Sequence, residues 1–356
     1  MPPAGGTWPP PRSRPFPPFA RPARPTRKRR AASDTSWCPA TRIGGQMTEL
    51  LTVGRVNLDL YSQQTGAEFA EARTFEAMIG GSPSNIAVAA ARLGVRTAVF
   101  TAVGDDLVGD WVLRAFERAG VDTTYVARKP GVHTSLALLG QIPPDDFPRT
   151  FYRDNPADIH LTVDEAASLP LAQVRAVLVS ADVFARGSTA DAAAWIMRTC
   201  REHDTTVYID LDLRPEHWPK PDEYSLLVGA ATNDADVVLG TAEEFAALQQ
   251  TDPQGIELSG EKQVMVLKRG GDGARVLTSE REFEAPVFDV PVASTVGAGD
   301  AFAAGLISGR IHGSSWEASA RLASACGAIT VSRFGCSEGF PTLGEVAELL
   351  GVSHGS

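Results

Sequence analysis

The 356-residue sequence lacks the features of several large classes of protein. Its four cysteines, Cys38, Cys200, Cys326 and Cys336, form no CxxC pair, so the spacing of a structural metal site is absent and reduced thiols are expected. No apolar run reaches the length of about 18 residues that spans a bilayer. No GK[ST] tripeptide occurs, which excludes a Walker A phosphate loop.

Basic residues are scarce outside the N-terminal segment. Residues 1–46 hold nine bases, one acid and 11 of the 25 prolines. The other 310 residues therefore carry 24 bases against 42 acids, a net charge of −18. Phosphate neutralisation needs clustered Lys and Arg, so this acidic body argues against nucleic acid as a partner. Its length suits one large α/β domain or two ordinary ones.

Residues 1–46 are expected to be a disordered Pro/Arg-rich extension. Dense proline opposes both helix and sheet, and the segment lacks the apolar core of a secretory signal. A basic tail or a PxxP ligand is the functional alternative. Met47 directly precedes TELLTVGRVNLD, which reads as a first core strand, so the folded domain is placed at residues 47–356.

Strand and helix patterns alternate along this domain, which predicts an α/β fold with a mostly parallel central sheet flanked by helices. The predicted strands are 50–54, 98–103, 174–180, 206–210, 237–240 and 264–268. The predicted helices are 84–93, 108–119, 190–202, 242–248, 298–308 and 316–331. Ser314 and Glu317 have the spacing of a capping box for the last helix.

Two regions, about 59–78 and 132–153, break this rhythm with the alternation of β-hairpins. Such strands do not fit easily inside a parallel sheet. A small antiparallel β lid over the strand ends is expected instead, beside a ligand.

The strongest local signal is ASTVGAGDAFAAGLISGR at residues 293–310. Gly297 and Gly299 allow a tight turn, and the helix predicted from Ala298 presents free N–H groups and the positive end of its dipole. Together these form an anion cradle, with Asp300 in the first helical turn. Phe302 breaks the dinucleotide pattern GxGxxG. An acid beside a phosphate cradle suggests phosphoryl transfer to a hydroxyl, whereas a dipole-complementing role for the acid is the plainer alternative.

A second signature, GGSPSNIAVAAARLG at residues 80–94, precedes this one by roughly 215 residues. The two together resemble the ribokinase (PfkB) family of carbohydrate kinases, over about residues 50–345. The resemblance implies a ribokinase-like fold, ATP and Mg²⁺, and a small-molecule sugar substrate. The scattered cysteines, the acidic body and the lack of a spanning apolar run suggest a cytoplasmic enzyme without nucleic-acid or membrane partners. The resemblance leaves K⁺ activation open, and an exposed lid sheet leaves a homodimer open.

The resemblance also assigns roles by position. It implies that Asp300 is the catalytic base. The other implied groups are an anion hole (Gly297, Ala298, Gly299), sugar contacts (Asp59, Gly80, Gly81, Asn85), ATP contacts (Lys268, Gly270, Gly273) and Glu244, which organises Mg²⁺ through water beside the ATP. In the motif of Glu244, Thr241 replaces the usual Asn.

Two arginines lie where substrate identity could be decided, Arg153 in FYRDNPAD and Arg214 in IDLDLRPEHW. Arginine binds carboxylates in a bidentate fashion, so an acidic sugar is expected. The alternatives are that Arg214 bonds Asp212 and that Arg153 is a solvated charge.

These segments resemble the branch of the family that phosphorylates the terminal hydroxyl of keto-deoxy sugar acids. The expected substrate is 5-dehydro-2-deoxygluconate of inositol catabolism. The alternatives are 2-keto-3-deoxygluconate, a neutral sugar such as ribose or fructose, and a silent sugar-binding regulatory protein.

We expect translation from Met47 to give a fully active protein, because the extension carries none of the predicted site residues. The measurement is kinase activity of a chain starting at Met47 beside that of the full chain. Loss of activity in the shorter chain would contradict this expectation.

Overall fold

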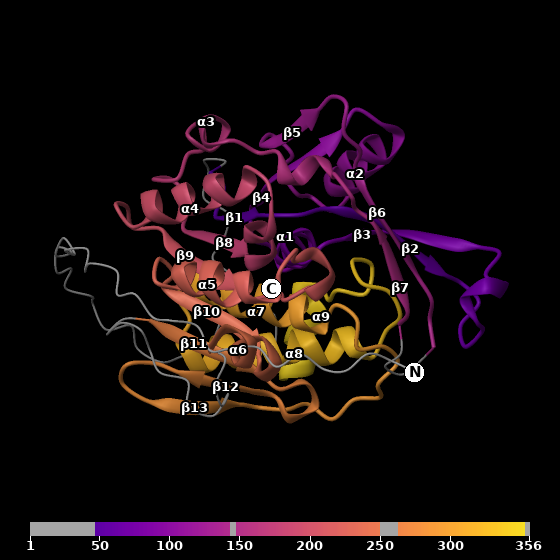
Figure 1. Ribbon diagram of the computed structural model, residues 1–356. Coiled ribbons are helices and arrows are strands. Elements are labelled where there is room, and N and C mark those ends of the chain that lie inside the picture. The colour runs from indigo at the N-terminus through magenta and orange to yellow at the C-terminus, as the bar shows by residue number, and fades with distance from the viewer. Residues whose placement is uncertain (1–46, 143–146, 250–262, 353–356) are drawn as a thin grey trace, which may run out of the picture. The chain divides into compact units, whose positions relative to one another are not determined.

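The computed structural model describes residues 47–142, 147–249 and 263–352. The expectation for residues 1–46 lies outside the described residues. Figure 1 shows the central sheet. Nine of its strands lie in the described residues. In spatial order these are β13 (Glu282–Ala285), β12 (Ala274–Leu277), β11 (Val264–Lys268), β10 (Val237–Thr241), β9 (Thr206–Asp210), β8 (Ala176–Ser180), β1 (Leu50–Val53), β4 (Thr97–Gly104) and β5 (Val126–Lys129).

The sheet is parallel from β11 to β5, and only β12 and β13 run antiparallel to their neighbours. Its inner strands, from β11 to β4, are buried on both faces. In β1, Leu50 belongs to one hydrophobic core and Leu51 to the other, as the period of two in a strand requires. This is why the strands read as continuous apolar runs.

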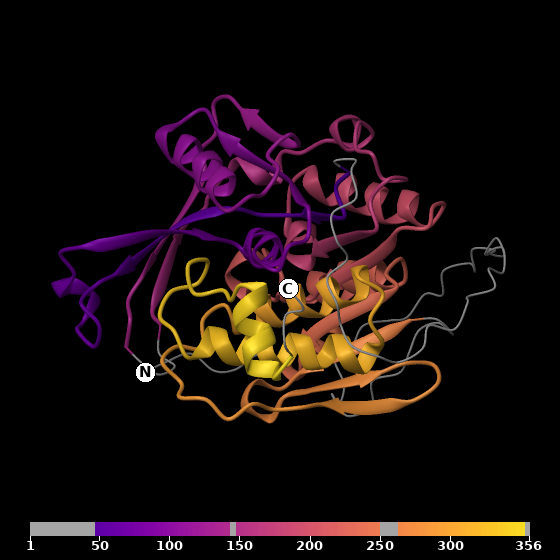
Figure 2. The ribbon, with the colours of Figure 1, turned by 180° about the vertical axis from the view of Figure 1, so that it is seen from behind.

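Helices cover both faces, as the two opposite views in Figures 1 and 2 show. One core packs α1 (Ser82–Arg92), α2 (Leu107–Arg118), α7 (Ala298–Ile311), α8 (Trp316–Val331) and α9 (Leu343–Leu350). The other packs α3 (Val163–Ala166), α4 (Thr189–Cys200), α5 (Pro221–Thr232) and α6 (Ala242–Gln249). The predicted fold class, a mostly parallel sheet flanked by helices, is confirmed.

A second sheet is formed by four strands in the order β3-β2-β6-β7. These are β3 (Phe75–Gly80), β2 (Asn57–Ser62), β6 (Ser135–Leu139) and β7 (Arg149–Tyr152). Antiparallel pairs β2–β3 and β6–β7 flank the parallel pair β2–β6. Since β2 follows β1 after three residues, the second sheet continues directly from the carboxyl edge of the first.

The helix caps differ from the sequence prediction at one place. The predicted capping box of Ser314 and Glu317 is wrong, because α8 is capped by Ser315, whose side chain accepts a hydrogen bond from the Ala318 N–H. The cap lies one residue later than predicted, so Glu317 is the second helical residue and cannot close the box. Glu317 instead pairs with Arg281.

Several elements have no counterpart in the sequence prediction: β5, β12, β13, α3, α5 and α9. The strands of the β12–β13 hairpin carry alternating charged residues, and α5 exposes Leu226 and Leu227, so neither shows a clear apolar period. No helix within the described ranges is long and apolar enough to cross a lipid bilayer.

Helices α7 and α8 pack closely because small residues line their contact. A Cβ on Gly305 would lie 2.8 Å from Ala323 Cα and 2.9 Å from Cys326 Sγ. We therefore expect Gly305→Ala to lower the free energy of unfolding by about 1–3 kcal/mol, the usual effect of overpacking.

Gly327→Ala is the matched control. A Cβ there meets nothing closer than Ala298 O at 3.6 Å, so this change should stabilise the helix by roughly 0.5–1 kcal/mol. Urea unfolding of both variants measures the difference. Equal effects of the two changes would contradict the packing argument.

Candidate active site

Polar side chains gather where the parallel strands of the central sheet end. Arg55 follows β1, Asp182 follows β8, Asp210 ends β9, and Lys268 ends β11. The carboxyl ends of parallel strands meet at one edge, where α/β sheets bind ligands. The first turns of α1 and α7 also reach this edge, because Ser84 Oγ on α1 donates to Arg55 O at 2.9 Å and Gly299 on α7 lies beside Lys268 Nζ.

Asp300 joins these two helices. Its carboxylate accepts hydrogen bonds from Ser82 Oγ at 2.8 Å and from Asn85 Nδ2 at 2.9 Å, both on α1. Burial raises the pKa of Asp300 above its ordinary value, and the charge of Asp212 adds to that effect. The two donors fix the carboxylate in position and partly offset the rise. Asp300 is therefore held still and is a stronger base than a solvated aspartate.

The N-terminus of α7 leaves backbone N–H groups next to this carboxylate. Gly297 caps the helix with a φ of +79°, a left-handed conformation suited to glycine. The first helical bond runs from the Ala301 N–H to Gly297 O, so the N–H groups of the preceding turn have no partner within the helix, and the Ala298 N–H makes only a long bond of 3.4 Å to Thr295 O. A side chain at Gly297 would also lie 2.8 Å from Cys336 Sγ. Gly297, Ala298 and Gly299 thus form an open turn at the positive end of the α7 dipole.

Asp59 lies on β2, beside the start of α1. Gly80 must lack a side chain, since a Cβ there would come within 2.1 Å of the Asp59 carboxyl group. Gly81 has a φ of +94°, and a Cβ there would lie 2.6 Å from Arg55 O. Burial raises the pKa of Asp59 to about 7, with Arg55 opposing and Asp300 adding to the rise. The predicted sugar residues are therefore brought together around the same space as Asp300.

Lys268 bonds Asp210 through Nζ, at 3.0 Å from Oδ1 and 3.1 Å from Oδ2. Burial would lower the pKa of Lys268, but Asp210 and Glu244 raise it overall, so the ammonium stays charged. A Cβ on Gly299 would lie 3.8 Å from Nζ, so this charge sits beside the α7 turn. Gly270 and Gly273 shape the turn after β11, with φ of +56° and +79°.

The Glu244 carboxylate is engaged by the backbone. It accepts from the Thr241 N–H at 2.7 Å and from the Leu213 N–H at 3.2 Å, while Thr241 Oγ1 accepts from the Glu244 N–H at 3.3 Å. Thr241 thus caps α6 in a capping box, which accounts for threonine in this motif. Across residues 47–142, 147–249 and 263–352, no three His, Cys, Asp or Glu side chains form a metal-binding group.

The two arginines predicted to bind a sugar acid have different surroundings. Arg153 is 7% exposed, and its two terminal nitrogens each lie 2.8 Å from an oxygen of Asp158. It is therefore not the solvated charge of the alternative interpretation. Arg214 donates to Asp212 Oδ1 at 2.8 Å and to Leu213 O at 3.1 Å, as the alternative interpretation expected, but keeps 29% of its side chain exposed. Of these two, only Arg214 presents an accessible guanidinium.

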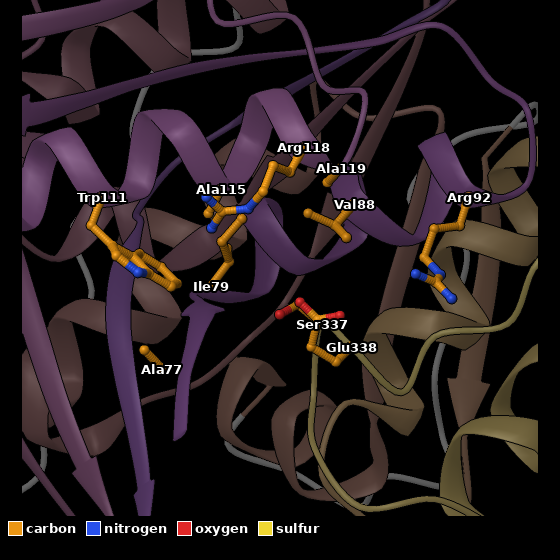
Figure 3. A pocket seen from close by; sticks show the side chains of 10 residues that line it. All are labelled: Ala77, Ile79, Val88, Arg92, Trp111, Ala115, Arg118, Ala119, Ser337 and Glu338. Carbon is orange, nitrogen blue, oxygen red and sulfur yellow. The ribbon is translucent and has the colours of Figure 1, made fainter. Parts of the chain in front are cut away.

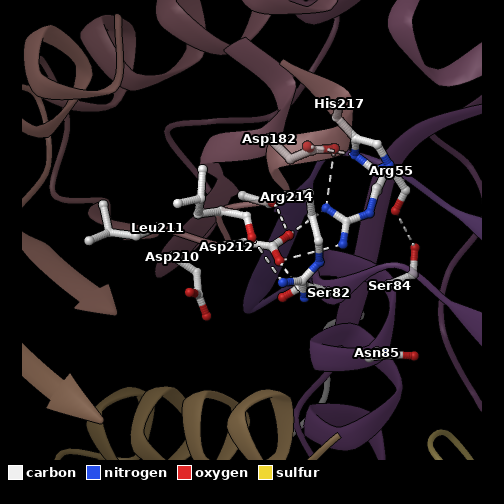
Figure 4. A network of polar contacts seen from close by, with 12 residues as sticks. Arg55, Ser82, Ser84, Asn85, Asp182, Asp210, Leu211, Asp212, Arg214 and His217 are labelled. Carbon is white, nitrogen blue, oxygen red and sulfur yellow. Dashed lines mark hydrogen bonds and ion pairs between the residues drawn. The ribbon is translucent and has the colours of Figure 1, made fainter. Parts of the chain in front are cut away.

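Sequence analysis missed Arg55, which lies at the centre of the network in Figure 4. Its buried guanidinium pairs with Asp212 and lies 3.2 Å from Asp182 Oδ2. Asp212, a non-glycine residue with a φ of +31°, also accepts from Ser180 Oγ at 2.8 Å. His217 Nδ1 lies 2.8 Å from Asp182 Oδ1.

Burial would raise the pKa of the two aspartates in this network, but the facing arginines hold both pKa values below the ordinary range. The sequence did carry a signal for Arg55, Asp182 and Asp212. Each of the three lies one or two residues past a predicted strand, at the edge of the sheet where ligands bind.

Three comparisons place the chain among known proteins. Residues 47–343 match the family described as pfkB family carbohydrate kinase. The chain is 30% identical over 317 residues to 5-dehydro-2-deoxygluconokinase 2 of Bacillus cereus, covering 86% of this chain and 96% of that one. It is 31% identical over 312 residues to 5-dehydro-2-deoxygluconokinase of Geobacillus thermodenitrificans, covering 85% and 93%.

Among solved structures, the fructokinase of Xylella fastidiosa with bound ATP is similar at a TM-score of 0.77. The identity is 26%, with 85% of this chain and 98% of that one covered. The ribokinase-like architecture predicted from the sequence is thus shared with a solved kinase.

Because the pKa of Asp59 is raised in the folded protein, the free energy of unfolding should decrease as the pH rises. The folded protein holds this proton up to about pH 7, whereas the unfolded chain releases it near pH 3.8, so stability falls as pH rises between the two. Asp59→Asn removes that loss. We expect the stability gain of this variant over the parent to grow by about 2 kcal/mol from pH 5 to pH 8.

Urea unfolding at the two pH values tests this, with the exposed Asp289→Asn as control. A gain that is the same at pH 5 and pH 8 would show that burial does not perturb Asp59.

Proposed function

The chain belongs to the pfkB family of carbohydrate kinases, and from this premise we propose that it transfers phosphate from ATP to the terminal hydroxyl of 5-dehydro-2-deoxygluconate. The family membership makes it a phosphotransferase acting on a sugar hydroxyl. The proposed substrate follows the names of relatives that match over more than nine-tenths of their length. The observation that carries the proposal is the position of Asp300 at the open turn of α7, facing the α1 residues beside Asp59.

In the proposed reaction, the sugar lies under the second sheet, which acts as the β lid. Asp59 and Asn85 hold its hydroxyls. The Oδ1 atoms of Asp59 and Asn85 are both buried and have no hydrogen-bond partner among the described residues. A buried polar atom with no partner is costly, so a ligand hydroxyl that bonds it recovers free energy.

Asp300 accepts the proton as the terminal hydroxyl oxygen attacks the γ-phosphorus and the bond to the β-phosphate oxygen breaks. Its raised pKa makes it better matched to this task than an ordinary aspartate. The N–H groups at the start of α7 donate to the transferring phosphoryl group, and donors of this kind are worth about 2.7–4 kcal/mol each in a transition state. Lys268 supplies a positive charge beside the same turn.

A divalent cation, Mg²⁺ in this proposal, neutralises charge on the ATP phosphates when bound. The site carboxylates already have donors: Lys268 on Asp210, Arg55 on Asp212, and backbone N–H groups on Glu244. These residues fit a cation that would be held mainly by phosphate and water, as Mg²⁺ commonly is, and Glu244 would be the residue nearest to its bound water. We also place the reaction in the cytoplasm, which supplies ATP and keeps thiols such as Cys200 and Cys326 reduced.

Arg214 is the group proposed to bind the carboxylate of the sugar acid, in preference to Arg153. Both terminal nitrogens of Arg153 are committed to Asp158, so a substrate would have to break a buried pair. Arg214 also has partners, Asp212 and Leu213 O, but its side chain is partly exposed, and it shares Asp212 with Arg55 at the same edge of the sheet. A neutral hexose is the second candidate, and the similarity to a fructokinase favours it.

Asp300→Asn should lower kcat by about 10²–10⁴-fold, because it removes the proton acceptor, and should change the KM for ATP little. Steady-state kinetics on the sugar acid measure both. Ser82→Ala, which removes one donor to the carboxylate, is the graded comparison and should have a smaller effect. Turnover of the Asp300→Asn variant close to that of the parent would refute the assignment.

Arg214→Met should raise the KM for a keto-deoxy sugar acid at least tenfold and leave the KM for fructose nearly unchanged, since the loss of one charged bidentate contact is worth about 1.5–3 kcal/mol. The coupled ADP assay with both sugars measures this. Arg153→Met is the contrasting variant. It leaves Asp158 buried and unpaired, so it should lower stability by about 3–5 kcal/mol. Equal KM changes for the two sugars in Arg214→Met would favour the neutral hexose.

A further inference from the structure

A pocket of about 310 Å³ lies behind the edge strand β3, away from the site described above. Figure 3 shows its walls, which come from α1, α2, β3 and the turn at residues 337–338. Its floor is apolar and small, formed by Ala77, Ile79, Val88, Ala115 and Ala119. The volume is at the lower end of the range for small-molecule sites.

Two arginines give this pocket its charge. Arg92 ends α1 and Arg118 ends α2, and both line the cavity. Among the described residues neither has an ion-pair partner, and Arg92 Nε is buried with no hydrogen-bond acceptor. Cation placement at a helix C-terminus accounts for a base at each position. It does not account for the buried, unsatisfied Nε of Arg92, a residue that lines the cavity, because such an atom has the cost of a lost hydrogen bond.

The remaining polar groups of the pocket indicate which class of ligand it would bind. The Arg118 guanidinium lies 5.9 Å from the ring centroid of Trp111, which holds it at the rim. Glu338 also lines the pocket, so the two arginines and one glutamate leave a net charge of +1. This combination suits a small organic anion with an apolar body on the alanine floor and one carboxylate or phosphate between the arginines.

The pocket wall is part of the turn that supports the active site. Gly335 packs on Met78, the cross-strand partner of Asp59 on β2: a Cβ on Gly335 would lie 2.7 Å from Met78 Cε. The next residue, Cys336, packs against Gly297 at the start of α7. Ser337 and Glu338 then line the pocket. A ligand that shifts residues 337–338 therefore acts on a segment that contacts Met78 on β3, the neighbour of Asp59, and Gly297 at the start of α7.

We propose that this pocket is an effector site for a small organic anion, which binds between Arg92 and Arg118 and alters sugar binding through residues 335–338. The proposal does not depend on which sugar is phosphorylated. Its binding test needs no sugar, so its failure is distinguishable from failure of the proposed function.

The binding test is calorimetric titration of the full chain with phenyl phosphate and with benzoate, which distinguish phosphate from carboxylate as the preferred anion. The active site is first saturated with a non-hydrolysable ATP analogue, so that its own phosphate turn cannot bind the probe. Benzyl alcohol, which is neutral, and inorganic phosphate, which lacks an apolar body, are the comparison probes. We expect saturable binding of at least one organic anion and at least tenfold weaker binding of both comparison probes.

The double variant Arg92→Gln/Arg118→Gln should weaken that binding at least tenfold, whereas Arg114→Gln, an exposed arginine on α2 outside the pocket, should not. Ala119→Met fills the pocket with both arginines retained and should also abolish binding. With the sugar that the enzyme turns over, the bound anion should change the sugar KM at least twofold in the parent and not in the double variant. Absence of saturable binding, or equal binding by the double variant, would overturn the site. Binding without a KM change would overturn its link to the active site.

Discussion

The active edge of the molecule depends on one buried ion-pair network, centred on Arg55. Its guanidinium joins the segments that follow β1, β8 and β9, through Asp182 and Asp212. Removing one partner of such a network leaves an uncompensated buried charge, which is strongly destabilising. The network therefore fixes the strand ends against one another. It also orients Arg214, which shares Asp212 and is the accessible guanidinium proposed to meet the substrate.

The candidate site adds a second constraint, the meeting of two helix N-termini. α1 brings Ser82 and Asn85, and α7 brings Asp300, so that hydrogen bonds close the gap between helices more than 200 residues apart. Glycines make the approach possible, since Gly80, Gly81 and Gly297 would each clash with a neighbour if they carried a Cβ. The glycines before α1 and α7 thus let the two helices meet, and Ser82 and Asn85 of α1 hold Asp300, the proposed base.

The basic side chains of this acidic protein fall into two groups, those paired with buried aspartates and those that are partly exposed or unpaired among the described residues. Lys268 and Arg55 are each balanced by a buried aspartate, and Arg153 is balanced by Asp158. Balanced pairs position groups without creating a strong local field, whereas the partly exposed Arg214 and the pocket arginines remain able to attract anions. The distribution separates bases that hold the structure from bases proposed to bind ligands. The net charge of −10 does not distinguish these two groups of bases.

Local pattern determined the six inner strands of the central sheet, six of the nine helices in the described residues and the glycine turn at the start of α7. Apolar period, glycine caps and the helix dipole act over a few residues, so the sequence specifies them directly. The tertiary structure decided which charged side chains form buried ion pairs. Arg55 and Asp212 are separated by 157 positions, and nothing local in the sequence pairs them or commits Arg153 to Asp158. The capping residue of α8 and the role of Thr241 as a helix cap were likewise settled by side-chain geometry. Periodicity predicts which residues are buried, but ion pairing depends on which chain ends the fold brings within a few ångströms.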